Sequence, residues 1–102
     1  MRAGIANYGD FMAEKIRCAH ILVDKESKAK EVLEKLKNGE SFSKLAQEYS
    51  IDSSRKRGGD LGYFGRGIMV KEFENAAFSL KPGEVSGIVK TQFGYHVIKR
   101  LA

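Results

Sequence analysis

The chain has 102 residues, of which 42% are hydrophobic and 30% are charged, so it can bury one core but is too short for two domains. Its net charge of +5, from 18 basic and 13 acidic residues, favours solubility and weak attraction to anionic surfaces over dedicated nucleic-acid binding. A single cysteine excludes an intrachain disulfide, and no apolar run approaches the roughly 20 residues of a transmembrane helix.

The N-terminal residues show neither a helical nor a strand period. We predict that residues 1–14 are a flexible tail or leader and that residues 15–102 form the folded domain. The first residues lack the uninterrupted apolar core of a secretory signal, because Gly4, Asn7 and Gly9 interrupt it. Together with the lone cysteine, this pattern predicts a cytoplasmic protein.

The next segments predict a strand and two helices. Residues 16–23 are β-rich and mostly apolar on both faces, which indicates a central strand with Cys18 and His20 on one face. Apolar residues recur at three- and four-residue steps over 27–37, which predicts a helix that ends at Asn38-Gly39. Ser41 is a suitable N-cap for a second helix, whose apolar stripe ends at Tyr49.

The second half alternates loops and short elements. The polar residues 50–57 are predicted to form a loop, with one short helical turn at most. Gly58 and Gly59 then permit a positive φ angle or a close chain approach before a short strand over 60–65. A third helix is expected over 70–80, where Pro82-Gly83 stops it.

Two final strands, 85–90 and 93–101, are predicted to flank a tight turn at Thr91-Gln92. The complete order is βαααβαββ, in which the short helical turn of residues 50–57 counts as a helix. We therefore expect an α+β fold, in which helices surround a four-stranded, mainly antiparallel sheet.

The two histidines, His20 and His96, are the only side chains whose unperturbed pKa lies near neutral pH. If their strands are neighbours, the imidazoles can hydrogen-bond each other and a hydroxyl such as that of Thr91. From the pattern alone, each fits a satisfied core histidine as well as a functional one.

The stretch 57–80 leads from glycine-rich residues into the third helix and carries three large apolar side chains, Leu61, Met69 and Phe73. These side chains can be ordinary core, and Phe73 above all fits that interpretation. Leu61 and Met69 lie outside any long periodic stripe. This favours a surface pocket for a rigid apolar ligand group.

Other chemistries find less support. The candidate metal ligands are Cys18, His20, Asp52 and His96, but no two-cysteine or His-x-x-x-His spacing accompanies them. A cysteine in a central strand is normally inert packing rather than a nucleophile. The glycine-rich stretch does not match a phosphate-binding loop. The basic cluster 55–57 fits a solvated loop, or a weak contact with acidic substrates, anionic membrane or nucleic acid.

Four blocks of the sequence resemble the parvulin-type peptidyl-prolyl cis-trans isomerases. They are HILV at 20–23, RGGDLGYFGRG at 57–67, MVKEFENAAFSL at 69–80 and GEVSGIVKTQFGYHVIKR at 83–100. The resemblance covers about residues 15–101. It implies a site on the concave side of the sheet, and it implies roles for two groups of residues. The substrate-binding group is Leu61, Met69, Phe73 and Phe93, and the catalytic group is His20, Asp52, Thr91 and His96.

The resemblance further implies a small, stand-alone and monomeric isomerase that uses no cofactor or metal and acts on proline-containing peptides and unfolded segments, thereby assisting folding. Asp52 stands where some parvulins carry a cysteine, so covalent cysteine catalysis is not available. Residues 24–28 lack the basic loop of the phosphate-selective members, and the chain has no tryptophan for a WW module. The alternative function is a holdase-like module that binds extended segments without catalysis.

Overall fold

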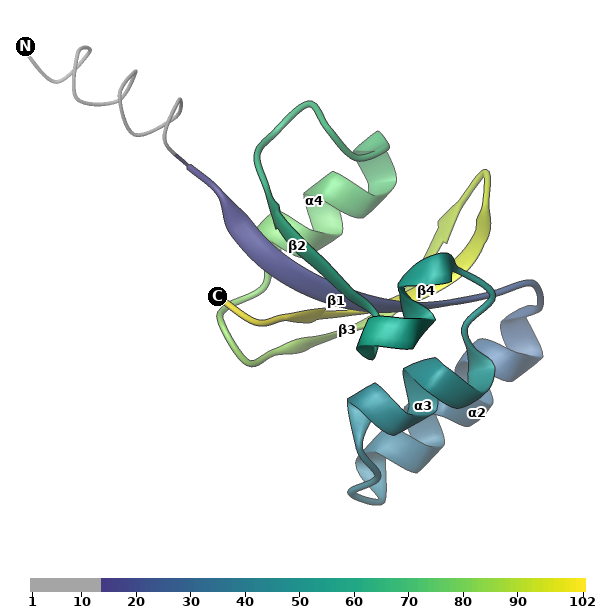
Figure 1. Cartoon of the computed structure of the whole chain (residues 1–102). Coiled ribbons are helices and arrows are strands. Elements are labelled where there is room, and N and C mark those ends of the chain that lie inside the picture. Colours follow the sequence, from purple (N-terminus) through teal and green to yellow (C-terminus); the bar gives the residue numbers. More distant parts are fainter. Residues whose placement is uncertain (1–13) are drawn as a thin grey trace, which may run out of the picture.

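The structure is a computed structural model that describes residues 14–102. Of the predicted tail, residues 1–13 lie outside the described residues. The elements follow in the order β1 (Ile16–Val23), α2 (Glu26–Lys37), α3 (Phe42–Tyr49), the 3₁₀ helix η1 (Ser53–Arg57), β2 (Asp60–Phe64), α4 (Lys71–Ser79), β3 (Val85–Thr91) and β4 (Gly94–Arg100) (Figure 1). The predicted α+β fold and its βαααβαββ order are confirmed, with η1 as the third helical element. Within the described part of the chain, no helix is long and apolar enough to cross a bilayer.

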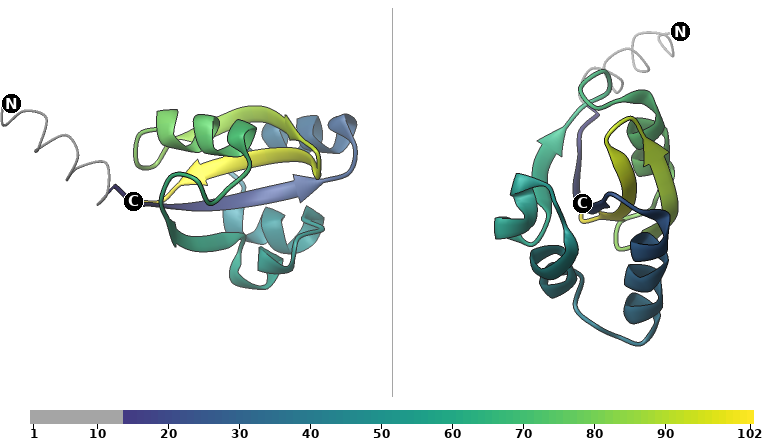
Figure 2. Two further views of the ribbon diagram at one scale, coloured as in Figure 1. Left: turned by 90° about the horizontal axis from the view of Figure 1, so that it is seen from above. Right: turned by 90° about the vertical axis from the view of Figure 1, so that its right-hand side faces the viewer.

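The four strands form one antiparallel sheet in the order β2-β1-β4-β3. The strand β1 is therefore central, as its two apolar faces predicted. Figure 2 shows α4 on one side of the strands and the segment of α3 and η1 on the other. This arrangement gives the sheet two separately covered faces.

The alternation of side chains along β1 divides the interior into two cores. Ala19, Ile21 and Val23 pack with α2 and α3, whereas Ile16 and Cys18 pack with α4 on the opposite face. Successive residues of a strand point to opposite faces, so one sequence of eight residues supplies both cores. Burying one such aliphatic side chain contributes roughly 1.5–3 kcal/mol.

Local signals explain how the helices begin. The Ser41 hydroxyl accepts a hydrogen bond from the Lys44 N–H at 3.2 Å and caps α3, as the sequence predicted. The helix α4 begins at Lys71 rather than at residue 70, because Val70 is its N-cap, and Val70 offers no side-chain acceptor.

The predicted turn at Thr91-Gln92 is wrong by one residue. Thr91 still pairs with Gly94 in the ladder between β3 and β4, so the turn consists of Gln92 and Phe93. The Thr91 hydroxyl accepts the Phe93 N–H at 3.1 Å and closes this turn. As a result, Thr91 has a fixed position at the end of β3.

Candidate functional site

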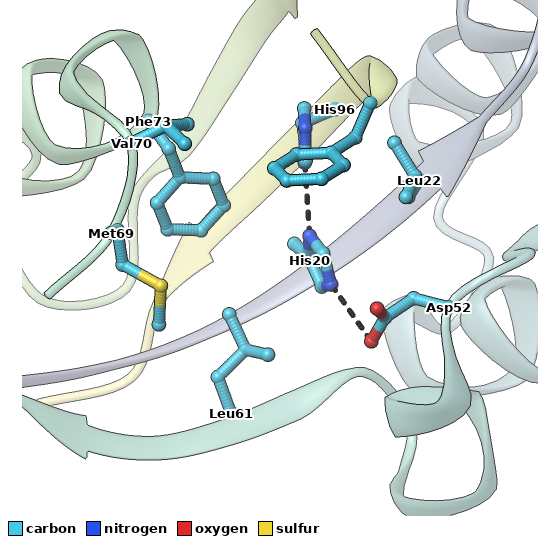
Figure 3. Close-up of a pocket in the computed structure, with 9 residues that line it drawn as sticks. His20, Leu22, Asp52, Leu61, Met69, Val70, Phe73 and His96 are labelled. Carbon is cyan, nitrogen blue, oxygen red and sulfur yellow. Dashed lines mark hydrogen bonds and ion pairs between the residues drawn. The ribbon is translucent and has the colours of Figure 1, made fainter. Parts of the chain in front are cut away.

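A hollow of about 220 Å³ opens on the side of the sheet that α4 covers (Figure 3). It is lined by His20, Leu22, Asp52, Leu61, Met69, Val70, Phe73, Phe93 and His96. Every residue that sequence reasoning singled out for the site lines this hollow, except Thr91, which lies behind His96. Protein pockets for drug-sized ligands measure roughly 300–1,000 Å³, so this hollow suits a single small ring.

Sequence reasoning missed two lining residues, Leu22 and Val70. Leu22 shares a face of β1 with His20, so the period-two alternation could have identified it. No comparable signal marks Val70. Its place in the hollow depends on how the loop before α4 turns, which periodicity does not determine.

Strand register brings the two histidines together. In the pairing of β1 with β4, His20 lies opposite Ile98 and Leu22 lies opposite His96. His20 and His96 are therefore diagonal neighbours on the same face of the sheet, within reach of each other.

Gly59 allows β2 to begin close against His20. Its φ angle is +87°, and a Cβ atom at this position would lie 2.3 Å from the carbonyl oxygen of His20. The His20 N–H donates to the Gly59 carbonyl at 2.9 Å. Any side chain at position 59 would displace the backbone that holds His20.

The hydrogen bonds expected among the two histidines and Thr91 are present. The Nδ1 atoms of His20 and His96 are 3.0 Å apart, and the Thr91 hydroxyl lies 2.7 Å from His96 Nε2. Burial lowers the pKa of both imidazoles, that of His96 to about 4 with a further contribution from His20. Both rings are therefore neutral at neutral pH.

The hydrogen bonds of Thr91 and the charge of Asp52 determine which atoms donate and which accept in this network. Because the Thr91 oxygen already accepts the Phe93 N–H, its own O–H is free to donate to His96 Nε2. His96 Nδ1–H then donates to His20 Nδ1, and His20 Nε2–H faces the carboxylate of Asp52. The reverse direction would aim a nitrogen lone pair at that carboxylate.

Asp52 supplies the negative charge of the hollow. Burial acts to raise the pKa of Asp52, but hydrogen bonds from Ser54 and the nearby His20 imidazole outweigh this effect and lower the pKa to about 2. The carboxylate also caps η1, since it accepts the Ser54 N–H at 2.9 Å. The nearest atoms of His20 Nε2 and Asp52 are 3.2 Å apart but poorly aligned, so this buried nitrogen has no well-formed hydrogen bond within residues 14–102.

Apolar side chains form the rest of the hollow. Phe73 is buried and directs its ring at both imidazoles, with centroid distances of 5.6 Å to His20 and 5.3 Å to His96 at steep interplanar angles. Phe73 is thus both a core residue and part of the hollow, which joins the two interpretations that its pattern allowed. Leu61 and Met69 are partly buried, and Phe93 is 57% exposed.

The remaining candidates lie elsewhere. Cys18 is fully buried in the core that packs against α4, and burial raises the pKa of its thiol to about 11, which suppresses the nucleophilic thiolate. No three His, Cys, Asp or Glu side chains of residues 14–102 are grouped as metal ligands. In the basic cluster, Arg55 donates to the Gln47 carbonyl at 2.8 Å and Arg57 to the Asp60 carbonyl at 3.3 Å, and neither lines the hollow.

Comparison with known proteins shows the family of the chain. The family described as the PPIC-type PPIase domain matches residues 9–101. The foldase protein PrsA of Geobacillus kaustophilus is 60% identical over 96 residues, which cover 93% of this chain and 34% of that protein. The chain thus spans about a third of the length of the curated relatives that it matches.

Solved structures show the same fold. The crystal structure of PrsA from Bacillus subtilis superposes with a TM-score of 0.86 at 52% identity and covers 100% of this chain and 40% of that chain. The solution structure of NmPin, the parvulin of Nitrosopumilus maritimus, has a TM-score of 0.79 at 59% identity. It covers 88% of this chain and 98% of that chain, so the same fold also occurs as a protein of similar size.

Proposed function

We propose, because this chain belongs to the PPIC-type peptidyl-prolyl isomerase domain family, that it accelerates cis-trans rotation about X-Pro bonds in peptides and unfolded proteins and so assists folding. The observation that carries this proposal is the meeting of an apolar hollow, lined by Leu61, Met69 and Phe73, with a buried pair of neutral histidines. These groups suit the binding of a ring beside a peptide bond.

The reaction requires binding rather than covalent chemistry. Rotation about an X-Pro bond breaks no σ bond, yet it takes roughly tens to hundreds of seconds without a catalyst. A catalyst needs only to bind the twisted bond better than either planar form. Because a planar amide has more charge separation than a twisted one, apolar surroundings destabilise the planar ground state relative to the transition state.

In this proposal the proline ring occupies the hollow among Leu61, Met69 and Phe73, and Phe93 contacts the peptide at its mouth. The Phe73 ring packs against both imidazoles in T-shaped contacts, so the hydrogen-bonded histidines hold the base of the ring site in one position. A rigid site matters because the bond must rotate while the ring stays bound.

Asp52 acts on the other half of the bond in this proposal. Its carboxylate, ionised above a pKa of about 2, lies close to the substrate carbonyl oxygen and disfavours negative charge there. This weakens the double-bond character of the C–N bond. The Ser54 N–H donates to the same carboxylate at 2.9 Å and holds it beside His20 Nε2–H, 3.2 Å away.

We also propose that the domain does not select phosphorylated serine or threonine before proline. No lysine or arginine lines the hollow, and its two imidazoles are neutral, so Asp52 gives it a negative charge. After β1, Asp24 of the loop already pairs with Lys28 of α2 at 3.7 Å. A phosphate before the proline would meet repulsion rather than a binding partner.

The test is nuclear magnetic resonance exchange spectroscopy on proline peptides that differ only in the preceding residue. The expected result is accelerated cis-trans exchange for leucine or alanine before proline, and much weaker acceleration for phosphoserine. Unchanged exchange rates with every peptide would refute isomerase activity. Faster exchange with the phosphorylated peptide would refute only the proposed selectivity.

A holdase-like module is the second candidate. The observation that favours it is the exposure of large apolar side chains on segments that border the hollow, with Phe93 57% and Ile68 70% exposed. Such residues can bind unfolded segments without catalysis. In the same experiment, this function predicts peptide binding without accelerated exchange. The cytoplasmic location and the monomeric state remain predictions.

A further inference from the structure

Residues 65–70, which we call the Met69 loop, connect β2 to α4 (Figure 1). Met69 and Val70 line the hollow from this loop, while Ile68 is exposed. Val70 makes no side-chain capping bond to α4. The Glu74 N–H donates to the Val70 carbonyl at 2.9 Å, and side chains of the loop add further contacts.

Arg66 joins the Met69 loop to two other parts of the molecule. Its guanidinium carbon lies 4.2 Å from the centre of the Phe78 ring on α4, and its Nη1 lies 3.6 Å from Glu74 Oε2. Its Nε lies 3.1 Å from Oε1 of Glu14, the residue that precedes β1 by two positions. One side chain thus connects the loop, the helix and the segment that enters the sheet.

Glu74 completes this connection from the first turns of α4. Its second oxygen, Oε1, accepts the Gly67 N–H at 2.7 Å, so the same carboxylate contacts Arg66 and the loop backbone. The Glu74 side chain is 17% exposed, which shields these contacts from water better than those of a fully exposed pair.

The loop backbone also lies close to the segment before β1. A Cβ atom at Gly65 would lie 3.4 Å from the Glu14 carbonyl oxygen. Glu14 belongs to the predicted tail, and it is the one residue of that tail that the structure describes. Its ion pair with Arg66, beside the close approach of its backbone to Gly65, links the segment before β1 to the wall of the hollow.

We propose that Arg66, together with Glu74 and Glu14, is a positioning group that sets the Met69 loop and thereby tunes the affinity of the hollow for its peptide. A change in the chain ahead of β1 then reaches the site through Glu14. This inference rests on the proposed function, because it is measured as substrate binding and turnover.

The test compares the full 102-residue chain with the variants Glu14→Gln, Arg66→Ala and their combination. Exposed or half-exposed ion pairs contribute up to about 1 kcal/mol, so each single change is expected to raise KM for a proline peptide about two- to fivefold, with kcat nearly unchanged. The double variant is expected to have the same KM as Arg66→Ala alone, because each single change already removes the contact between Arg66 and Glu14. Arg66→Lys keeps the charge but loses the planar guanidinium that contacts Glu14 and stacks on Phe78. Its KM should therefore lie between those of wild type and Arg66→Ala.

Arg55→Ala is the matched control, since Arg55 binds a backbone carbonyl on α3 and does not touch the loop. It is expected to leave KM unchanged. Fully additive effects of Glu14→Gln and Arg66→Ala, or an unchanged KM in an active protein, would overturn the proposal. The proposal would also be overturned if the rise in KM followed the fall in the denaturation midpoint in every variant.

A second measurement separates this proposal from the proposed function. Amide resonances of residues 65–70, recorded without peptide, are expected to shift in Glu14→Gln and to stay in place in Arg55→Ala. An inactive wild type would refute the isomerase function, yet these shifts would still support the connection from Glu14 to the loop. Unshifted amides would refute the connection even in an active enzyme.

Discussion

The two faces of the sheet differ in what they bury. On the face that α2 and α3 cover, the hydrophobic core comprises Ala19, Ile21, Val23, Ala29, Val32, Phe42, Leu45, Ala46 and Val97, and the only buried polar residues of the segment from α3 to η1 within the described chain are two serines, Ser50 and Ser54. On the face that α4 covers, apolar residues share the interior with the buried side chains of His20, Thr91 and His96, and a hollow remains open. One face is therefore suited to stability, and the other gives up close packing in exchange for a site.

The largest expected effect concerns the face that α2 and α3 cover, which we call the closed face; the face that α4 covers is the open face. Ile21 is fully buried on the closed face, so Ile21→Ala should lower the free energy of unfolding by about 2–5 kcal/mol, and Ile21→Val by about 0.5–1.5 kcal/mol. Chemical denaturation measures both. Below the unfolding transition, KM for a proline peptide should equal that of wild type. A large rise in KM with unchanged stability would contradict the division between the two faces.

The second effect tests the buried histidines of the open face through pH. His96 is 3% exposed, and its pKa is about 4 in the folded protein, against an ordinary value near 6.5. Between these values the unfolded chain binds more protons, so stability is fully present above about pH 6.5 and falls as pH decreases toward 4. The loss from His96 alone is on the order of 3 kcal/mol.

Denaturation at several pH values measures this slope, and His96→Gln is the comparison, since it removes the titrating group. The Asp52 carboxylate, with a pKa of about 2, contributes its own loss only below about pH 4, outside this window. Equal slopes for wild type and His96→Gln between pH 6.5 and 4 would contradict the assignment to His96.

The third effect tests the apolar wall of the hollow. Met69→Ala removes most of a side chain that lines the hollow, which should lower kcat/KM roughly 10- to 30-fold, since each buried methylene contributes about 0.8 kcal/mol. Ile68→Ala, next to it but 70% exposed, is the matched control and should change kcat/KM less than about twofold. Equal losses in both variants would favour a broad apolar binding surface, as in a holdase.

The fourth effect separates the charge of Asp52 from its structural role. Asp52→Asn keeps an oxygen that can cap η1 but removes the charge near the hollow, so stability should change little. Because the side chain is about a third exposed, the expected loss of kcat is about fivefold, with a smaller change in KM. Isomerisation kinetics on a model peptide measure both constants. Full kcat in Asp52→Asn or Asp52→Ala would exclude the proposed effect on the carbonyl.

Local patterns in the sequence were sufficient for most of the fold. The alternation in β1 predicted a central strand with two apolar faces, and Ser41 predicted the start of α3, because both depend on neighbours in sequence. The turn at Gln92 and Phe93 was misplaced by one residue, since its position depends on how long Thr91 stays paired with Gly94.

The site was less accessible to such reasoning. Periodicity put His20 on one face of a strand, but its meeting with His96, Asp52 and Met69 depends on the pairing of β1 with β4 and on two loops. The resemblance to the parvulins supplied that grouping. Neither source indicated Val70 in the wall or the contacts of Arg66 with Glu74 and Glu14, because these follow from the path of one loop.

The smallest expected effect tests whether the open face is less stable because Val70 does not cap α4. Val70 is the N-cap of α4 and lines the hollow, but it offers no acceptor to the N–H groups of the first turn. Val70→Thr has nearly the same shape and adds a hydroxyl, so it should raise the free energy of unfolding by about 0.5–1 kcal/mol. The added polarity should raise KM about twofold, because the proline ring then meets a less apolar wall. Higher stability with unchanged KM would show that the hollow tolerates a capping residue, and that valine at this position is not required for binding.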